Sequence, residues 1–398
     1  MPERMPEVRM PRTILHLDLD AFFCAAEELH QPALRGKAFA VGGRPDERGV
    51  VASCSYAARA LGVHSAMPMS RALRQCPGLI IVSPTRNIYE SLSGQVMDRL
   101  NNLAPLVEQI SIDEAFVDIS DLPAAPLETA RLLQKQILDE LGLPCSVGVA
   151  SNKLVAKIAT ECGKKSARGS RDYPFGLTQV PAGTEAAFLH NLPVSMLWGV
   201  GPKTEKRLAE LGIHTIGALA ALGETTLAGL FGENGRDLAR HALGIDDRPV
   251  HNEHVTKSIS QENTFAKDVS DDKVLEKMLR DLSYEVAKNL RQEHLAGSTI
   301  KLKIRWSDFT TLSRQTTLPS PTNLDEEIYR TARDLLHKLR QNGQPVRLIG
   351  VGVTNLGPPV VQMELWGSQS EKSRKLQAAL DDLQARYGKK IISTHRKN

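Results

Sequence analysis

The sequence predicts an α+β fold spread over several domains, and three observations support this. First, strand-like and helix-like segments follow one another through the first 174 residues, with acidic residues at strand ends. Second, the chain from about Phe175 to residue 243 shows only short helical patterns. Third, a strand-and-helix pattern restarts after residue 257 as a small α+β domain. A length of 398 residues also exceeds what a single core normally holds.

The composition is that of a soluble globular protein, with 41% hydrophobic and 24% charged residues and a net charge of +4. No apolar run reaches the roughly 20 residues that span a bilayer. Residues 1–11 are charged and rich in proline, which predicts a disordered extension rather than a secretion signal, and Met5 or Met10 could be the true start. The five cysteines form no CxxC pair, which indicates reduced thiols and a cytoplasmic location.

Acidic residues lie on two segments that are otherwise apolar. The first predicted strand, 13–20, carries Asp18, and a predicted β-hairpin at 108–120 carries Asp113 and Glu114 at its tip. Strand alternation sends neighbours to opposite faces, so both tip residues can reach one site only if the tip is bent. Surface acids would give the same local pattern. Buried unpaired carboxylates are costly, however, and a pair of divalent cations, which prefer oxygen ligands, would remove that cost.

Candidate phosphate-binding residues lie on the following segments. Tyr56 and Arg59 are one helical turn apart and can reach the same phosphate group, although such a pair can equally cover core surface. Ser53 can add a hydroxyl. Residues 153–171 hold six Lys and Arg against the single acid Glu161, a run that is often only a solvated face.

Two later segments predict contacts with phosphate groups. LWGVGPKTEKRLAELGI resembles a helix–hairpin–helix, in which Gly199 and Gly201 form the hairpin and Pro202 and Lys203 begin the next helix. Glycines let the backbone approach a phosphate, and the free N–H groups of a helix N-terminus can bind it without reading base sequence.

A basic face is predicted in the last domain. KLKIRW alternates Lys301, Lys303 and Arg305 on one face of a strand, and Arg314 and Arg347 lie on the neighbouring predicted strands. Lysines that protect a sheet edge would give the same pattern. We favour phosphate contact.

Four motifs together resemble the Y-family DNA polymerases, closest to the DinB or DNA polymerase IV branch: DLDAFFCAAEE, SCSYAARALGVHSAMP, SIDEAFVDIS and VGVASNKLVAKIA. The resemblance extends from about Ile14 to Leu356 and implies a right-hand polymerase with a helical thumb and a C-terminal little-finger domain. It divides the chain into a disordered extension (1–11), palm (12–21 and 85–174), fingers (22–84), thumb (175–243), linker (244–257), little finger (258–357) and a tail (358–398).

The resemblance also assigns roles in catalysis. It implies that Asp18, Asp113 and Glu114, with the backbone carbonyl of Leu19, ligate two Mg²⁺ ions. Phe23 corresponds to the steric gate, whose ring lies under the sugar and excludes a 2′-hydroxyl.

The resemblance places a triphosphate-binding lysine at Lys164. The family usually follows this lysine with proline and then glycine, whereas this chain has KKSARG, so Lys165 could take the role. The remaining residues that the resemblance implies for nucleotide binding are Phe23, Ser53, Tyr56 and Arg59.

The implied function is low-fidelity, template-directed DNA synthesis across damaged template, with transfer of a nucleotide from a dNTP to a primer 3′-hydroxyl. The expected partners are primer–template DNA and dNTPs, with no membrane and a monomeric protein. A catalytically weak Y-family scaffold that bridges clamp and DNA is the alternative. A nucleotidyl cyclase, which also carries acids on palm-like strands, is a second rival from another enzyme class.

A further partner is predicted from the tail. QMELW resembles the peptide by which bacterial polymerases bind the sliding clamp, with Gln362, Leu365 and Trp366 as the determinants. Trp366 could instead pack against a helix predicted for Glu371–Tyr387.

Overall fold

The computed structural model describes residues 12–167, 173–253, 255–340 and 343–359. The chain divides into two compact units, residues 1–45 with 49–254, and residues 255–398 with 46–48. Within the described ranges, every helix is too short or too polar to cross a bilayer.

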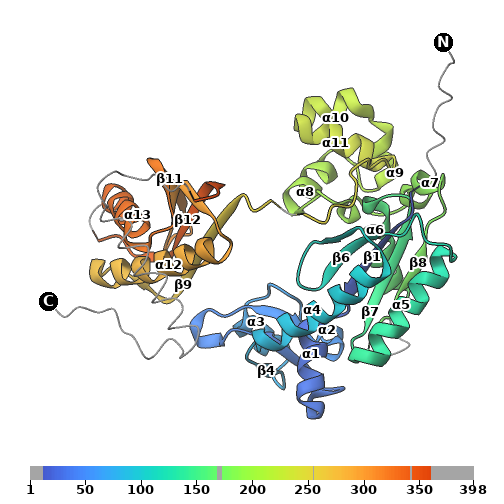
Figure 1. Cartoon of the computed structure of the whole chain (residues 1–398), viewed down its shortest axis with the longest axis horizontal. Helices are drawn as coiled ribbons and strands as arrows, with labels where there is room; N and C mark the ends of the chain where they lie inside the picture. Colours follow the sequence, from blue (N-terminus) through green and yellow to red (C-terminus); the bar gives the residue numbers. More distant parts are fainter. Residues whose placement is uncertain (1–11, 168–172, 254, 341–342, 360–398) are drawn as a thin grey trace. The chain divides into compact units, whose positions relative to one another are not determined.

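The first unit is built on a five-stranded sheet in the order β5-β6-β1-β7-β8 (Figure 1). Its central strand β1 pairs antiparallel with β6 and β7, and β8 pairs parallel with β7. The strands are β1 (Ile14–Leu19), β5 (Val107–Gln109), β6 (Glu114–Asp118), β7 (Cys145–Ala150) and β8 (Leu177–Gln179).

The two faces of this sheet differ, because β1 alternates as the sequence predicts. Leu15, Leu17 and Leu19 are buried in the larger core of the unit. The helices that contribute to that core are α1 (Phe22–His30), α4 (Arg86–Leu103) and α5 (Pro126–Leu141). His16 and Asp18 point to the opposite face, where α6 (Lys153–Ser166) supplies their partners. The acidic face of β1 therefore meets a basic helix.

A small three-stranded sheet, ordered β3-β2-β4, follows α1. Strands β2 and β3 lie on either side of the GRPDERG turn and pair antiparallel, and β4, three residues long, pairs parallel with β2. The elements are η1 (Pro32–Leu34), β2 (Phe39–Gly42), η2 (Pro45–Glu47), β3 (Val51–Cys54), α2 (Tyr56–Ala60), α3 (Met69–Gln75) and β4 (Ile80–Val82).

The expected helical region is present, with one correction. The prediction of helices alone from Phe175 is wrong for β8, which completes the sheet by pairing with β7. Three residues are too few to show an alternation. The helices that follow are α7 (Glu185–His190), η3 (Val194–Met196), α8 (Pro202–Glu210), α9 (Ile216–Ala221), α10 (Gly223–Phe231) and α11 (Glu233–Ala242).

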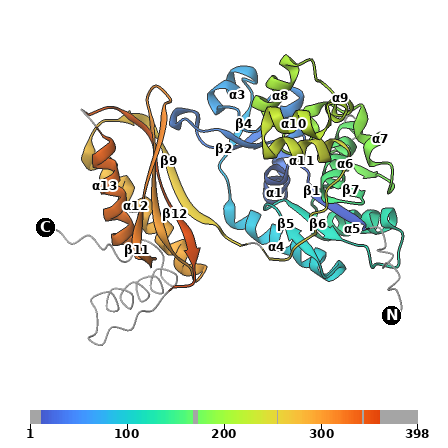
Figure 2. The same cartoon turned by 90° about the horizontal axis from the view of Figure 1, so that it is seen from above.

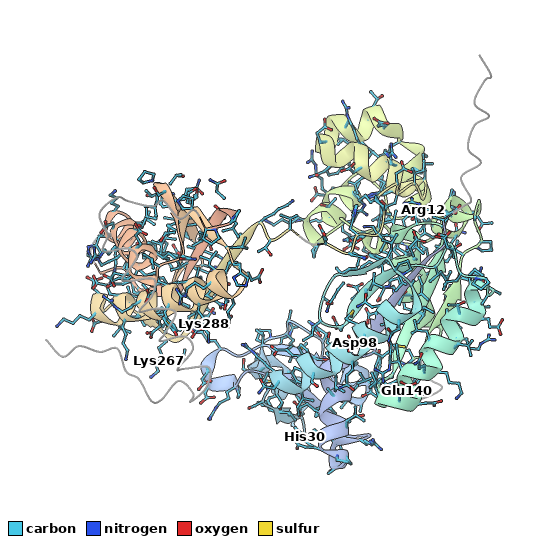
Figure 3. The ribbon with its side chains drawn as sticks, viewed as in Figure 1. Arg12, His30, Asp98, Glu140, Lys267 and Lys288 are labelled. Atoms are coloured by element: carbon cyan, nitrogen blue, oxygen red, sulfur yellow. The ribbon has the colours of Figure 1, made fainter. Side chains whose placement is uncertain are left out.

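The segment after α11, predicted to be a linker from Gly244, is instead fixed to the first unit through Asn252. Arg12 donates hydrogen bonds to the carbonyl oxygens of residues 246–248, at 2.9–3.3 Å (Figure 3 labels Arg12). The carboxylate of Asp246 is buried and accepts from the guanidinium of Arg248 at 2.7 and 2.8 Å. Asn252 bonds the first residue of β5. Arg248 and Asn252 are exposed and only Asp246 is buried, so the polarity of the segment does not reveal that it is bound to the first unit.

The second unit is an antiparallel four-stranded sheet ordered β11-β10-β12-β9, with α12 and α13 packed side by side against one face (Figure 2). Ile300, Leu302 and Ile304 of β10 point into the core beneath these helices. β9 was not predicted, because only Ile259 and Phe265 of its twelve residues are buried. The elements are β9 (Ser258–Val269), α12 (Asp272–Gln292), β10 (Ala296–Trp306), β11 (Thr311–Thr322), α13 (Asp325–Leu339) and β12 (Val346–Gly357).

Candidate active site

A cavity of about 220 Å³ opens in the first unit where β1 ends and α1 begins. It combines carboxylates, cationic groups and aromatic rings. Its lining residues are Asp18, Leu19, Ala21, Phe22, Phe23, Ala52, Ser53, Tyr56, Arg59, Ser65, Asp113 and Lys164.

The three predicted acids converge because β1 and β6 are neighbours. Asp18 is directly opposite Glu114 in the strand register, and the amide of Leu19 donates to the carbonyl oxygen of Asp113 at 2.9 Å. Asp113 precedes the strand, and its carboxylate accepts from the hydroxyl of Ser111 within the tight tip. The bent tip that the sequence required is therefore present, and it brings two adjacent acids toward one site.

Asp18 is held in an environment that disfavours its charge. Burial raises the pKa of its carboxyl to about 7, and the ammonium of Lys164, 2.6 Å away, offsets only part of this effect. The nearby negative charges of Asp113 and Glu114 contribute to the raised pKa. A cation bound beside Asp18 would therefore gain more favourable electrostatic energy than a cation bound beside an exposed aspartate.

Glu114 has the opposite character. Burial raises its pKa, but the hydrogen bonds and charges of His16 and Lys157 outweigh burial and lower the pKa to about 2. His16 is buried, and its Nε2 lies 2.6 Å from Oε1 of Glu114, while Lys157 donates to the same oxygen. Glu114 is consequently an anion held in a fixed position. It lies beside the cavity and does not line it.

One helix supplies the partners of this whole acidic face. Spaced three to four residues apart, polar side chains of α6 form a stripe along the sheet. From the start of the helix to its end, they contact Glu108, Glu114, His16 and Asp18 in turn. The residues of this α6 stripe are Lys153, Lys157, Thr160 and Lys164.

The opposite wall presents a tyrosine and an arginine from α2. The guanidinium of Arg59 lies 4.8 Å from the centre of the Tyr56 ring, and its Nε donates to the carbonyl oxygen of Cys54 at 3.1 Å. Tyr173 contacts the same tyrosine ring edge-on at 5.5 Å and donates to Glu28 at 3.0 Å. Arg59 is thus held at the cavity with donors of its guanidinium available to an anion.

The floor of the cavity is aromatic. Phe23 stacks on Tyr89 with ring centres 4.4 Å apart and planes 16° apart. The Tyr89 hydroxyl donates to the buried carboxyl of Glu27, one turn further along α1. Ala21 starts this helix with a positive φ of 46°, which turns the chain sharply out of β1. The Phe23 ring therefore has a rigid support from α4.

The donor set fits hard divalent cations, although the side chains are not yet arranged around one. Among the described residues, no group of three or more His, Cys, Asp or Glu side chains is placed to hold a metal ion. Oxygens of Asp18 and Glu114 instead accept from Lys164, Lys157 and His16. Carboxylate and carbonyl oxygens are nevertheless the ligands that Mg²⁺ prefers, and burial, which raises the pKa of Asp18, disfavours a negative charge that a bound cation would stabilise.

Comparison with known proteins identifies this arrangement. The sequence matches the impB/mucB/samB family over residues 17–161, the C-terminal domain of that family over 256–365 and its HHH motif over 183–213. A DNA polymerase IV from Dehalococcoides mccartyi strain CBDB1 is 38% identical over 389 residues, which are 97% of either chain. The chain belongs to the Y-family of DNA polymerases. Within the Y-family it is a DinB-type polymerase.

Solved Y-family structures support the same assignment. A Y-family polymerase chimera, Dbh-Dpo4(243-245)-Dbh, matches with a TM-score of 0.77 and 27% identity over 87% of this chain and 99% of its own. An insertion ternary complex of Dbh DNA polymerase matches with a TM-score of 0.60 and 28% identity over the same shares. Y-family membership brings DNA-directed DNA polymerase activity, a dependence on divalent metal, and binding of DNA and dNTPs. It excludes the nucleotidyl cyclase alternative.

Most residues that the Y-family resemblance selected lie on the cavity wall. Of the two candidate lysines, Lys164 is in the cavity, whereas Nζ of Lys165 points away and lies 3.3 Å from Sδ of Met196. Glu114 is beside the cavity, not on its wall. The predicted residues found on the wall are Asp18, Leu19, Phe23, Ser53, Tyr56, Arg59, Asp113 and Lys164.

Four functional candidates were missed by sequence reasoning. His16 could have been found, because strand alternation already placed it on the face of Asp18. Lys157 could also have been found, because it lies two helical turns before Lys164. Tyr89 and Tyr173 carry no local signal, since each reaches the site only through tertiary packing.

In the thumb, the predicted hairpin is present. Gly199 has φ 100°, a conformation that side chains rarely adopt, and Gly201 precedes Pro202 at the first position of α8. Lys203 is exposed on the first turn of this helix. The free N–H groups of α8 are therefore accessible beside a cationic side chain.

In the little finger, β10 lies inside the sheet, so protection of an edge does not explain its lysines. Lys301, Lys303 and Arg305 alternate with the buried residues of β10, although Lys303 is paired with Glu262 at 2.7 Å. Arg314 does not join this face, because its register partner is the buried Leu302.

The remaining predicted contact residues have mixed outcomes. The guanidinium of Arg347 stacks 4.3 Å from the ring centre of the exposed Phe309. The proposed clamp peptide, with Gln362, Leu365 and Trp366, lies outside the described residues, as does the helix predicted at Glu371–Tyr387.

The two lysines provide a matched pair for mutation. Lys164→Ala is expected to weaken dNTP binding by about 2 kcal/mol, or about thirtyfold, because a charge-assisted contact with a phosphate is lost. Lys165→Ala is the control and is expected to bind dNTP as the unchanged protein does. The measurement is nucleotide affinity on a dideoxy-terminated primer–template, where no turnover occurs. If only the Lys165 variant loses affinity for dNTP, the triphosphate-binding residue is Lys165 and not Lys164.

Proposed function

We propose that this Y-family enzyme carries out low-fidelity, template-directed DNA synthesis across damaged template, with Asp18, Asp113 and Glu114 holding two Mg²⁺ ions. The observation that carries the proposal is a single cavity that joins acids at the end of β1 and the tip before β6 to cationic groups and an aromatic floor. A nucleoside triphosphate needs each of these: metal ligands, phosphate donors and a surface beneath the sugar.

The residues divide the reaction among them. When bound, the ions lower the pKa of the primer 3′-hydroxyl and neutralise the diphosphate that leaves. Asp18, Asp113, Glu114 and the carbonyl of Leu19 supply the oxygen ligands. Asp18, Asp113 and Leu19 line the cavity, which supports this role for them. Glu114 is opposite Asp18 in the strand register, which supports the same role for Glu114.

The nucleotide is held by four further side chains. Lys164 and Arg59 supply positive charge, and Tyr56 and Ser53 supply hydroxyls, to the triphosphate. Phe23 supports the sugar as the steric gate. Ala52, beside Ser53 on the wall, is too small to press on the nascent base pair, which agrees with low fidelity.

The test is primer extension on matched templates with and without an abasic site. The polymerase hypothesis expects extension of both, with synthesis continuing past the lesion. The alternative, a scaffold that bridges clamp and DNA without catalysis, expects DNA binding without extension. Binding without nucleotide addition at any Mg²⁺ concentration would favour the scaffold.

Duplex DNA is expected to contact two further regions. Gly199, Gly201 and Lys203 in the thumb would bind phosphates, as would a little-finger set comprising Lys301, Lys303, Arg305 and Arg347. The accessible N-terminus of α8 and the basic residues of β10 support these contacts. The affinity should fall steeply as salt is raised.

We infer a monomer in the cytoplasm, where the five free thiols would stay reduced. Light scattering measures the oligomeric state.

The clamp is the remaining proposed partner. Short peptides bind grooves through a few large anchors, which in QMELW are Leu365 and Trp366, with Gln362 as the polar determinant. Replacing all three with Ala is expected to abolish stimulation by the sliding clamp on long primed DNA while leaving extension of a short primer unchanged. If Trp366 packs on the tail instead, the variant melts at a lower temperature and still responds to the clamp.

A further inference from the structure

A buried histidine beside the proposed metal ligands has no part in the function described so far. His16, two residues before Asp18 on β1, is 1% exposed. Its Nε2 lies 2.6 Å from Oε1 of Glu114, and its Nδ1 lies 2.8 Å from Oγ1 of Thr160 on α6. Both nitrogens thus have partners, as burial of a polar ring requires. The ring is fixed between β6 and α6.

The chemistry of the carboxylate sets the direction of these bonds. An ionised glutamate only accepts hydrogen bonds, so Nε2 of His16 carries a hydrogen and donates it to Glu114. The Thr160 hydroxyl can donate to Nδ1 or accept from it, so the contact holds whether the ring is neutral or protonated. The chain of contacts from Thr160 through His16 to Glu114 therefore does not depend on the charge of the ring.

Room for this chain of contacts comes from a glycine. Gly148 on β7 is directly opposite His16 in the strand register. A Cβ atom at this position would lie 2.1 Å from the carbonyl oxygen of Ala156 and 2.6 Å from Oγ1 of Thr160. Any side chain here would push α6 from the sheet. The absent side chain lets Thr160 reach the histidine.

We propose that His16, oriented by Thr160, is a positioning residue that holds the Glu114 carboxylate ready for a divalent cation. His16 and Lys157 both contact Oε1, which leaves Oε2 for the ion. A glutamate with free rotamers must be ordered when metal binds, whereas one already fixed need not be. The inference rests on the proposed function, because it takes Glu114 as a metal ligand.

The test compares three variants by metal binding without turnover. His16→Leu removes the donor at similar volume, His16→Gln restores an N–H group, and Thr160→Val keeps shape but removes the hydroxyl. Binding of Mn²⁺ is measured from the electron paramagnetic resonance of free ion, on complexes with a dideoxy-terminated primer and matching dNTP. His16→Leu is expected to bind about tenfold more weakly or worse, His16→Gln within about threefold of the unchanged protein, and Thr160→Val in between.

A control separates positioning from stability. Lys153, one turn before Lys157, donates to Glu108 at 2.8 Å and does not line the cavity. Lys153→Met should lower the melting temperature and leave Mn²⁺ affinity unchanged. In extension assays, His16→Leu should lower kcat while KM for dNTP stays the same, because the triphosphate donors are untouched.

The outcomes are distinguishable. Mn²⁺ affinity equal to that of the unchanged protein in both His16→Leu and Thr160→Val overturns the inference and makes His16 an ordinary core histidine. If His16→Leu does not fold, Thr160→Val alone decides. A protein that binds Mn²⁺ with this mutational pattern but extends no primer supports the inference and defeats the proposed function.

Discussion

Asp113→Asn is expected to lower the rate of nucleotide addition by about a thousandfold, while affinity for primer–template changes by less than about threefold. The amide keeps the size of the side chain but loses the negative charge that faces the cavity. Metal ions stabilise the charge of a phosphoryl-transfer transition state by several kcal/mol, and a loss of about 4 kcal/mol corresponds to that factor. Duplex affinity survives because it comes mainly from phosphate contacts elsewhere.

The matched control is Asp118→Asn on the same β-strand. Asp118 lies at the far end of β6 and accepts hydrogen bonds from Ser120, outside the cavity. This variant should extend primers at the normal rate even if it melts earlier. Single-turnover extension measures the rate and anisotropy of labelled DNA measures the binding. An Asp113→Asn protein that retains the normal rate removes Asp113 from the metal site.

Phe23→Val is expected to raise incorporation of ribonucleotides relative to deoxyribonucleotides by about a hundredfold. Forcing an extra atom into a packed site costs about 1–3 kcal/mol, and release of about 2.7 kcal/mol gives this factor. This steric cost applies to a ribonucleotide here because the Phe23 ring cannot move away from the 2′-hydroxyl. The ring of Tyr89 stacks against it and blocks that movement. The measurement is the ratio of kcat/KM for a ribonucleotide and its deoxy counterpart on one template.

Tyr89→Phe serves as the comparison, because it keeps the supporting ring and removes only the hydroxyl that bonds Glu27. Exclusion of ribonucleotides should persist in this variant, although a buried carboxyl loses its partner. A Phe23→Val enzyme that still rejects ribonucleotides would show that Phe23 is only a packing residue.

The proposed metal-binding acids could be selected from the sequence because their signal is local. Asp18 interrupts an apolar strand, and Asp113 and Glu114 interrupt an apolar hairpin, so each departs from a pattern visible within a few residues. The register that makes Asp18 and Glu114 neighbours then follows from the pairing of β1 and β6. The helix–hairpin–helix could be predicted in the same way, because its glycines and proline indicate the hairpin and the start of the next helix.

Other features depend on contacts that no local pattern carries. The strand β8 is three residues long and owes its conformation to its parallel partner. The segment after Gly244 looks like a solvated linker, yet Arg12, more than 230 residues earlier in the chain, binds its carbonyl groups. The face of the sheet on which Arg314 lies could be assigned only from its register with Leu302.

The α6 stripe makes the site sensitive to the length of one helix as well as to the side chains that the helix carries. An α-helix turns by about 100° for each residue. One residue inserted or deleted near Lys153 would therefore rotate the rest of the stripe away from Glu114, His16 and Asp18 together. The remaining residues of α6 offer little freedom either, because only Lys165 and Ser166 of this helix are exposed. Engineering of this enzyme must therefore keep both the residues of the stripe and the residue count between Lys153 and Lys164.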